Sequence, residues 1–122
     1  MEFGKAVELV TALSDRERAL SIGRDAVESR LAACSQLGGP IRSTYEWKGR
    51  IEQEEEWVLI LKTLPGTSSA LADFVRSRHP YETPEILLRE VDVSTAYLAW
   101  MAGNLDEGVR GPRPRDATPS SP

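Results

Sequence analysis

The order of strand and helix patterns along this chain limits the folds that it can adopt. Apolar and β-branched runs predict strands, and apolar residues at three- and four-residue spacing predict helices. We expect strands over residues 6–12, 34–47, 50–62 and 85–91, and helices over residues 14–31, 68–77 and from 94 onward. This order is that of the ferredoxin-like β-α-β-β-α-β sandwich, an α+β fold, with an additional C-terminal helix.

Local signals predict where these elements begin and end. Ser14-Asp15-Arg16-Glu17 is a capping box, which makes Ser14 the expected N-cap of the first helix. Gly38-Gly39-Pro40 predicts a bulge in the second strand, and Lys48-Gly49 fits the two-residue loop of a hairpin. From Leu105 onward, four prolines and two glycines predict a disordered tail over residues 105–122, after a single domain over residues 1–104.

Composition excludes several classes of protein. The 122 residues are 40% hydrophobic and 28% charged, which is typical of one soluble domain. The net charge of -4 and the lack of a basic cluster disfavour nucleic acid as a partner. No apolar run approaches the roughly 18 residues that a membrane span needs, and residues 1–5 lack signal-peptide features, so we expect a cytoplasmic protein with no membrane contact.

The third expected strand carries apolar side chains on both faces. Residues 57–61 are apolar at alternate and intervening positions, yet two helices cover only one face of a four-stranded sheet. A large exposed apolar patch is unusual in a soluble monomer. We therefore expect identical subunits to pack sheet against sheet, and the long hairpin over residues 41–62 could reach a neighbouring subunit.

Two prolines clamp a polar loop between the second expected helix and the last strand. The segment His79-Pro80-Tyr81-Glu82-Thr83-Pro84-Glu85 holds the single histidine of the chain. Each proline fixes its own φ and restricts the residue before it, so we expect a rigid loop. A rigid polar loop indicates a binding site, or a corner that docks onto a neighbouring subunit.

His79 is the first candidate for a metal ligand, because neutral imidazole commonly binds late transition metals. One imidazole does not close a site, so Glu82, or Cys34 and Glu85, or the same residues of other subunits would have to complete it. A histidine before a proline can also simply hydrogen-bond the backbone and hold a turn. Both interpretations stay open, and Cys34 can equally be an inert buried thiol.

Three glutamates alternate along the third expected strand. Glu52, Glu54 and Glu56 should therefore point to the same face of the sheet. Such a row could collect cations loosely, but it is more typical of a solvated strand end that discourages edge-to-edge aggregation. No nucleophile, base and orienting group can be assembled from the sequence, so we do not expect an enzyme.

Four segments resemble the signatures of a known family. They are Arg30-Leu31-Ala32-Ala33-Cys34, Tyr45-x-Trp47-x-Gly49-x-Ile51-Glu52, Leu61-Lys62-Thr63 and residues 79–86, His-Pro-Tyr-Glu-Thr-Pro-Glu-Ile. In this order they are similar to the CutA family of divalent-cation tolerance proteins, over roughly residues 5–104. The resemblance implies a ferredoxin-like fold, a tight homotrimer resembling the PII signalling proteins, and a role in tolerance to copper and other divalent metals.

The resemblance also bears on metal binding. Some family members carry proposed copper ligands at positions that are Val10 and Arg78 in this chain. Loss of a thiolate and an imidazole removes soft ligands on which copper affinity depends. The expectation is therefore weak binding of Cu²⁺ or Zn²⁺, with His79, Glu82 and Cys34 as the candidate ligands.

A second function stays open beside metal tolerance. A PII-like signalling or scaffold trimer would bind a small anion or a partner protein at clefts between its subunits. Lys62, Tyr81, Trp47 and Glu85 are the candidate residues for such a cleft. This alternative rests on analogy of fold, which carries less weight than residue chemistry.

Overall fold

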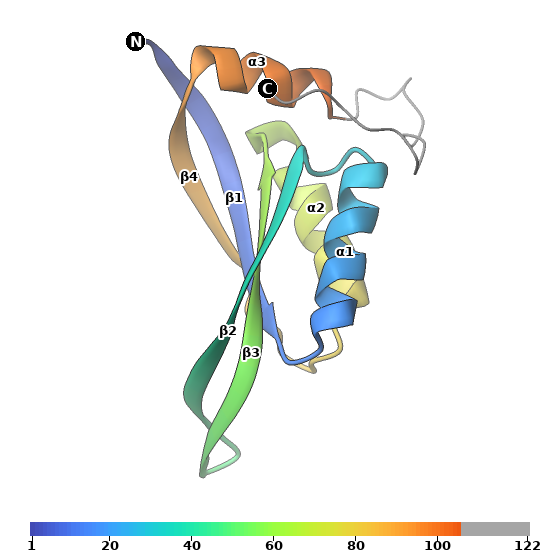
Figure 1. Ribbon diagram of the computed structural model, residues 1–122, viewed down its shortest axis with the longest axis vertical. Coiled ribbons are helices and arrows are strands. Elements are labelled where there is room, and N and C mark those ends of the chain that lie inside the picture. Colours follow the sequence, from blue (N-terminus) through green and yellow to red (C-terminus); the bar gives the residue numbers. More distant parts are fainter. Residues whose placement is uncertain (106–122) are drawn as a thin grey trace.

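The computed structural model describes residues 1–105 and has the predicted α+β architecture (Figure 1). The elements are β1 (Phe3–Leu13), α1 (Arg16–Glu28), β2 (Cys34–Trp47), β3 (Arg50–Thr63), α2 (Pro65–Arg78), β4 (Leu87–Ser94) and α3 (Thr95–Gly103). The strands form one antiparallel sheet in the order β2-β3-β1-β4. None of the helices within residues 1–105 has the length and apolarity that a membrane crossing requires.

The main core lies between the sheet and the two helices α1 and α2 (Figure 1). Because side chains alternate along a strand, every second residue of β1 and β3 points to these helices. The largest fully buried side chains of this core are Leu9, Leu13, Ile22, Leu59, Leu61, Leu71 and Val75. Full burial of each such side chain contributes about 1.5–3 kcal/mol, so this layer holds the helices on the sheet.

Helix α3 packs on the opposite face of the sheet, at the end where β1 begins. Its Met101 is fully buried in a second apolar cluster with Ala6 and Ala33. Leu105 belongs to the same cluster and is only 3% exposed. The prediction that the tail starts at Leu105 is therefore wrong at that residue, because its side chain closes this cluster. Residues 106–122 lie outside the described part of the chain.

Two predicted helix starts are corrected by the structure. Asp15, and not Ser14, is the N-cap of α1, since its carboxylate accepts a hydrogen bond from the Arg18 amide at 3.0 Å. Helix α2 begins at Pro65 and not at Ser68. A proline fits the first turn of a helix because its missing N–H would have no partner there.

The hairpin of β2 and β3 has the features that its glycines predict. The strand register shifts between Gly38 and Ile41, where a bulge was expected. Lys48 and Gly49 both have positive φ, 52° and 79°, as the favoured two-residue hairpin turn requires. The hairpin extends beyond the layer formed by α1 and α2 (Figure 1). Strand β4 starts at Leu87, two residues later than the sequence predicts.

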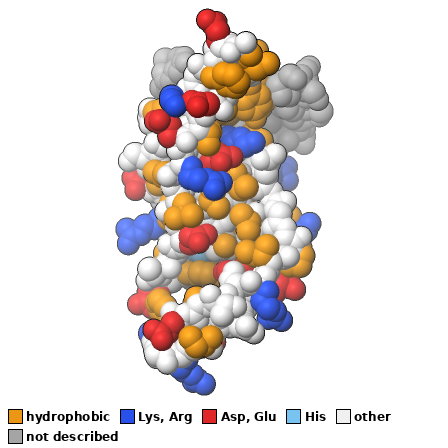
Figure 2. Space-filling model, turned by 90° about the vertical axis from the view of Figure 1, so that its left-hand side faces the viewer, with side chains coloured by type: hydrophobic (Ala, Val, Ile, Leu, Met, Phe, Trp, Pro, Cys, Tyr) orange, Lys and Arg blue, Asp and Glu red, His pale blue; other side chains and the backbone are white. Residues whose placement is uncertain are grey.

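The face of the sheet opposite α1 and α2 is open where α3 does not cover it. Figure 2 shows hydrophobic side chains gathered in the middle of this side of the molecule, with charged side chains around them. Leu87 and Ile41 remain 48% and 42% exposed. The predicted second apolar face is thus confirmed, and we call it the open face.

Candidate functional site

The structure divides the predicted cleft residues between two hollows on the side of the sheet opposite α1 and α2. Trp47, Tyr81, Glu82 and Glu85 line a groove of about 920 Å³ between the β2–β3 hairpin and the proline-clamped loop. Lys62 lines a separate cavity of about 190 Å³ under α3. One chain therefore does not bring the four predicted cleft residues together.

The larger hollow is acidic and aromatic. Five carboxylate residues line it: Glu52, Glu54, Glu56, Glu82 and Glu85. None of its lining residues within the described part of the chain is a lysine, arginine or histidine. Desolvation, followed by the neighbouring Glu54, raises the pKa of Tyr45 in this groove to about 12. We call this larger hollow the acidic groove. Its charge favours cations, although carboxylates in a row do not by themselves make a site.

Both ring nitrogens of His79 have protein partners. Nδ1 accepts a hydrogen bond from the Tyr81 amide at 3.2 Å, so Nε2 carries the proton and donates to the Ala12 carbonyl at 3.1 Å. The His79 residue is only 8% exposed, and its ring lies edge-on to Tyr81 with centroids 4.8 Å apart. Burial lowers the pKa of His79, partly offset by the Ala12 bond and by Glu56. This is the geometry of a histidine that holds a turn.

Tyr81 ties the loop to two strands of the sheet. Its hydroxyl donates to Oε2 of Glu56 at 2.7 Å and accepts from the amide of Ser14 at 2.9 Å. Glu56 is 6% exposed, so the expectation of a solvated strand end is wrong for this glutamate, while Glu52 and Glu54 remain partly exposed. Sequence reasoning missed this pair because the two residues are 25 positions apart and nothing local links them.

The described residues of one chain do not form a tight copper or zinc site. Within residues 1–105, no three His, Cys, Asp or Glu side chains are placed to hold a metal ion. Cys34 lies level with Glu8 of β1, because both pair with Lys62 of β3. His79 instead bonds to Ala12, four residues further along β1. Cys34 therefore lies near Tyr97 at the α3 end and does not join His79.

Comparison with known proteins agrees with this architecture. The family model described as CutA1 divalent ion tolerance protein matches residues 7–104. The chain belongs to the CutA1 family. Protein CutA of Homo sapiens is 46% identical over 84 residues, which are 68% of this chain and 47% of the human protein. This chain therefore spans about half the length of that relative.

Bacterial CutA proteins match over more of their length. Divalent-cation tolerance protein CutA of Thermotoga maritima is 44% identical over 71% of this chain and 86% of its own. The structure of CutA from Synechococcus elongatus PCC7942 superposes with a TM-score of 0.80 at 34% identity, covering 87% of this chain and 95% of that one. The predicted family and its ferredoxin-like fold are thus confirmed.

The first prediction for this CutA1 protein concerns the hydroxyl of Tyr81. Tyr81→Phe leaves the buried Glu56 carboxylate without its donor and the Ser14 amide without its acceptor. We expect the free energy of unfolding in urea to fall by about 1–3 kcal/mol. Tyr45→Phe is the comparison, because it removes a hydroxyl that bonds to the less buried Glu54, and it should cost less than Tyr81→Phe. Equal losses in the two variants would contradict a special role for the Glu56 contact.

The second prediction concerns pH. Since burial lowers the folded-state pKa of His79 below 6.5, the unfolded chain takes up a proton first as the pH falls through 6.5. The free energy of unfolding should therefore decrease below that pH and level off below the folded-state pKa. The difference between the urea midpoints of wild type and His79→Gln, measured from about pH 7.5 to 5.5, should become smaller as the pH falls. A constant difference would refute this contribution.

Proposed function

We propose that this chain contributes to divalent-cation tolerance as a non-enzymatic, cytoplasmic homotrimer that binds Cu²⁺ or Zn²⁺ weakly. The observation that carries the proposal is membership of the CutA1 family over residues 7–104. Relatives of bacterial origin carry the name divalent-cation tolerance protein. The network of His79 and Tyr81 supports a structural role for the clamped loop, and no residue of it is poised as a nucleophile.

The open face supports the homotrimer. Val10 lines the acidic groove and pairs directly with Leu87, so the two side chains lie on the same face of the sheet. Leu87 is half exposed there, and no helix within residues 1–105 covers it. An apolar strand surface of this kind is stabilised when another copy of the chain packs on it.

The geometry of His79 supports weak metal binding. A cation at Nδ1 has to displace the hydrogen bond from the Tyr81 amide, and Nε2 is already engaged with Ala12. The exposed carboxylate of Glu82, three residues along the loop, is the predicted second ligand. Because one imidazole and one carboxylate leave the coordination of copper or zinc incomplete, affinity is low.

Sedimentation tests the assembly. Wild type should sediment at close to three times the 13.5 kDa mass of one chain. Leu87→Glu places a charge on the open face and should shift the protein towards monomers. Leu20→Glu is the matched control, because Leu20 is exposed to a similar extent, 39%, on the outer side of α1. A wild type that stays at 13.5 kDa at micromolar concentration would overturn the homotrimer.

Calorimetric titration with Cu²⁺ and Zn²⁺ tests the metal. Wild type should bind weakly, without saturating when metal and protein are equimolar. Glu82→Gln and His79→Ala should each weaken binding further, whereas Glu17→Gln, an exposed carboxylate on α1, should not. Tight stoichiometric binding would contradict weak affinity. Isotherms unchanged in both loop variants would remove His79 and Glu82 from the site.

A further inference from the structure

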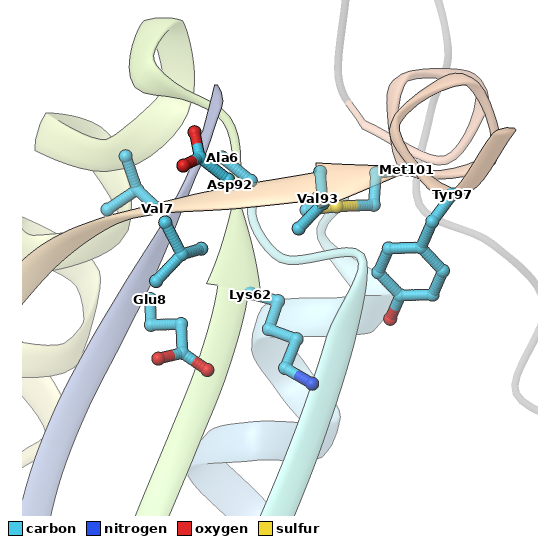
Figure 3. Close-up of a pocket in the computed structure, with 9 residues that line it drawn as sticks. Ala6, Val7, Glu8, Lys62, Asp92, Val93, Tyr97 and Met101 are labelled. Carbon is cyan, nitrogen blue, oxygen red and sulfur yellow. The ribbon is translucent and has the colours of Figure 1, made fainter. Parts of the chain in front are cut away.

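We propose that the cavity under α3 binds a small carboxylate with a short apolar chain, held by the ammonium of Lys62 and the hydroxyl of Tyr97. The cavity has a volume of about 190 Å³ and lies between α3 and the strands β1, β3 and β4 (Figure 3). This site goes beyond the role in cation tolerance and does not rest on it.

Lys62 forms no ion pair with the carboxylates around the cavity, including Glu8, which lies opposite it in the strand register. Two carboxylates also line the cavity, but each is engaged with another cation: Glu8 with Arg89 at 3.2 Å, and Asp92 with Lys5 at 2.6 Å. The Lys62 ammonium has no ion pair or hydrogen bond within residues 1–105. A partly buried cation of this kind is stabilised by an anion that reaches it.

Tyr97 supplies a second donor. Its ring extends from α3 and Lys62 extends from β3 over the same part of the sheet (Figure 3). Burial, followed by the charge of Cys34 and a hydrogen bond with it, raises the pKa of Tyr97, so the hydroxyl keeps its proton at neutral pH. This hydroxyl exchanges Cys34 for a carboxylate that enters the cavity. An ammonium together with a hydroxyl gives a carboxylate one charge-assisted and one neutral hydrogen bond.

Size and wall chemistry select the class of anion. The cavity is smaller than the roughly 300–1,000 Å³ that typical organic ligands occupy, so a nucleotide does not fit inside it. Its remaining walls are apolar and come from Ala6, Val7, Val91, Val93 and Met101. A fully oxygenated anion such as phosphate would face these walls without donors, whereas a short alkyl chain would lie against them.

Methyl NMR of the full chain in its native assembly tests this site. The protein has two methionines, Met1 and Met101, and the Met101 side chain lines the cavity. With ¹³C-methyl methionine, butyrate should shift the Met101 signal saturably and leave the Met1 signal in place. Butyramide, which has the same shape without the charge, should bind at least about tenfold more weakly, and so should inorganic phosphate.

Variants identify the two donors. Lys62→Met should weaken butyrate binding at least about tenfold, Lys62→Arg should retain it, and Tyr97→Phe should weaken it about two- to tenfold. Lys48→Met, at the hairpin turn, is the matched control and should bind as wild type does. Unchanged affinity in Lys62→Met would overturn the proposal. If that variant does not fold, equal binding of butyrate, butyramide and phosphate to wild type would overturn it.

Discussion

The structure depends on one mismatch, between strands that are apolar on both faces and helices that cover only one of them. Leu59 and Leu61 of β3 point to α1 and α2, while Val58 and Ile60 point the other way. Helix α3 covers only the end of that second face, around Ala6. The rest remains open in one chain, and this exposed apolar surface is the physical basis of the assembly that we propose.

The proline-clamped loop shows that a conspicuous polar motif can have a structural role, with its polar atoms used in hydrogen bonds within the fold. His79 and Tyr81 use their polar atoms to join the loop to the end of β1 and to β3. A buried polar group that loses its partner costs more free energy than a typical hydrogen bond contributes. A metal ion at His79 would therefore compete with the fold, and this competition adds to the incomplete ligand set as a reason for the weak affinity that we propose.

The fold could be predicted because its signals are local and repeated. Strand alternation, helical spacing and the Lys48-Gly49 turn each act within a few residues, and all point to the same architecture. Ser14 and Asp15 show the limit, since both residue types cap helices and the local pattern does not decide between them; in the fold, Asp15 caps α1 and the Ser14 amide donates to the Tyr81 hydroxyl. The burial of Glu56 depends on the same distant tyrosine, so no pattern along β3 could reveal it.

Charge is distributed unevenly along the side of the sheet opposite α1 and α2, so the two hollows on this side differ chemically. The acidic groove collects carboxylates from β3 and the clamped loop, whereas the cavity under α3 contains the ammonium of Lys62. The acidic groove therefore favours cations, whereas an anion at the other end is proposed on the strength of Lys62 alone, since Glu8 and Asp92 of that cavity are engaged with Arg89 and Lys5. Lys62 lines the same cavity as Tyr97, and not the groove that Tyr81 lines. Its position along β3, and not its membership of a motif, decides which ligand it can reach.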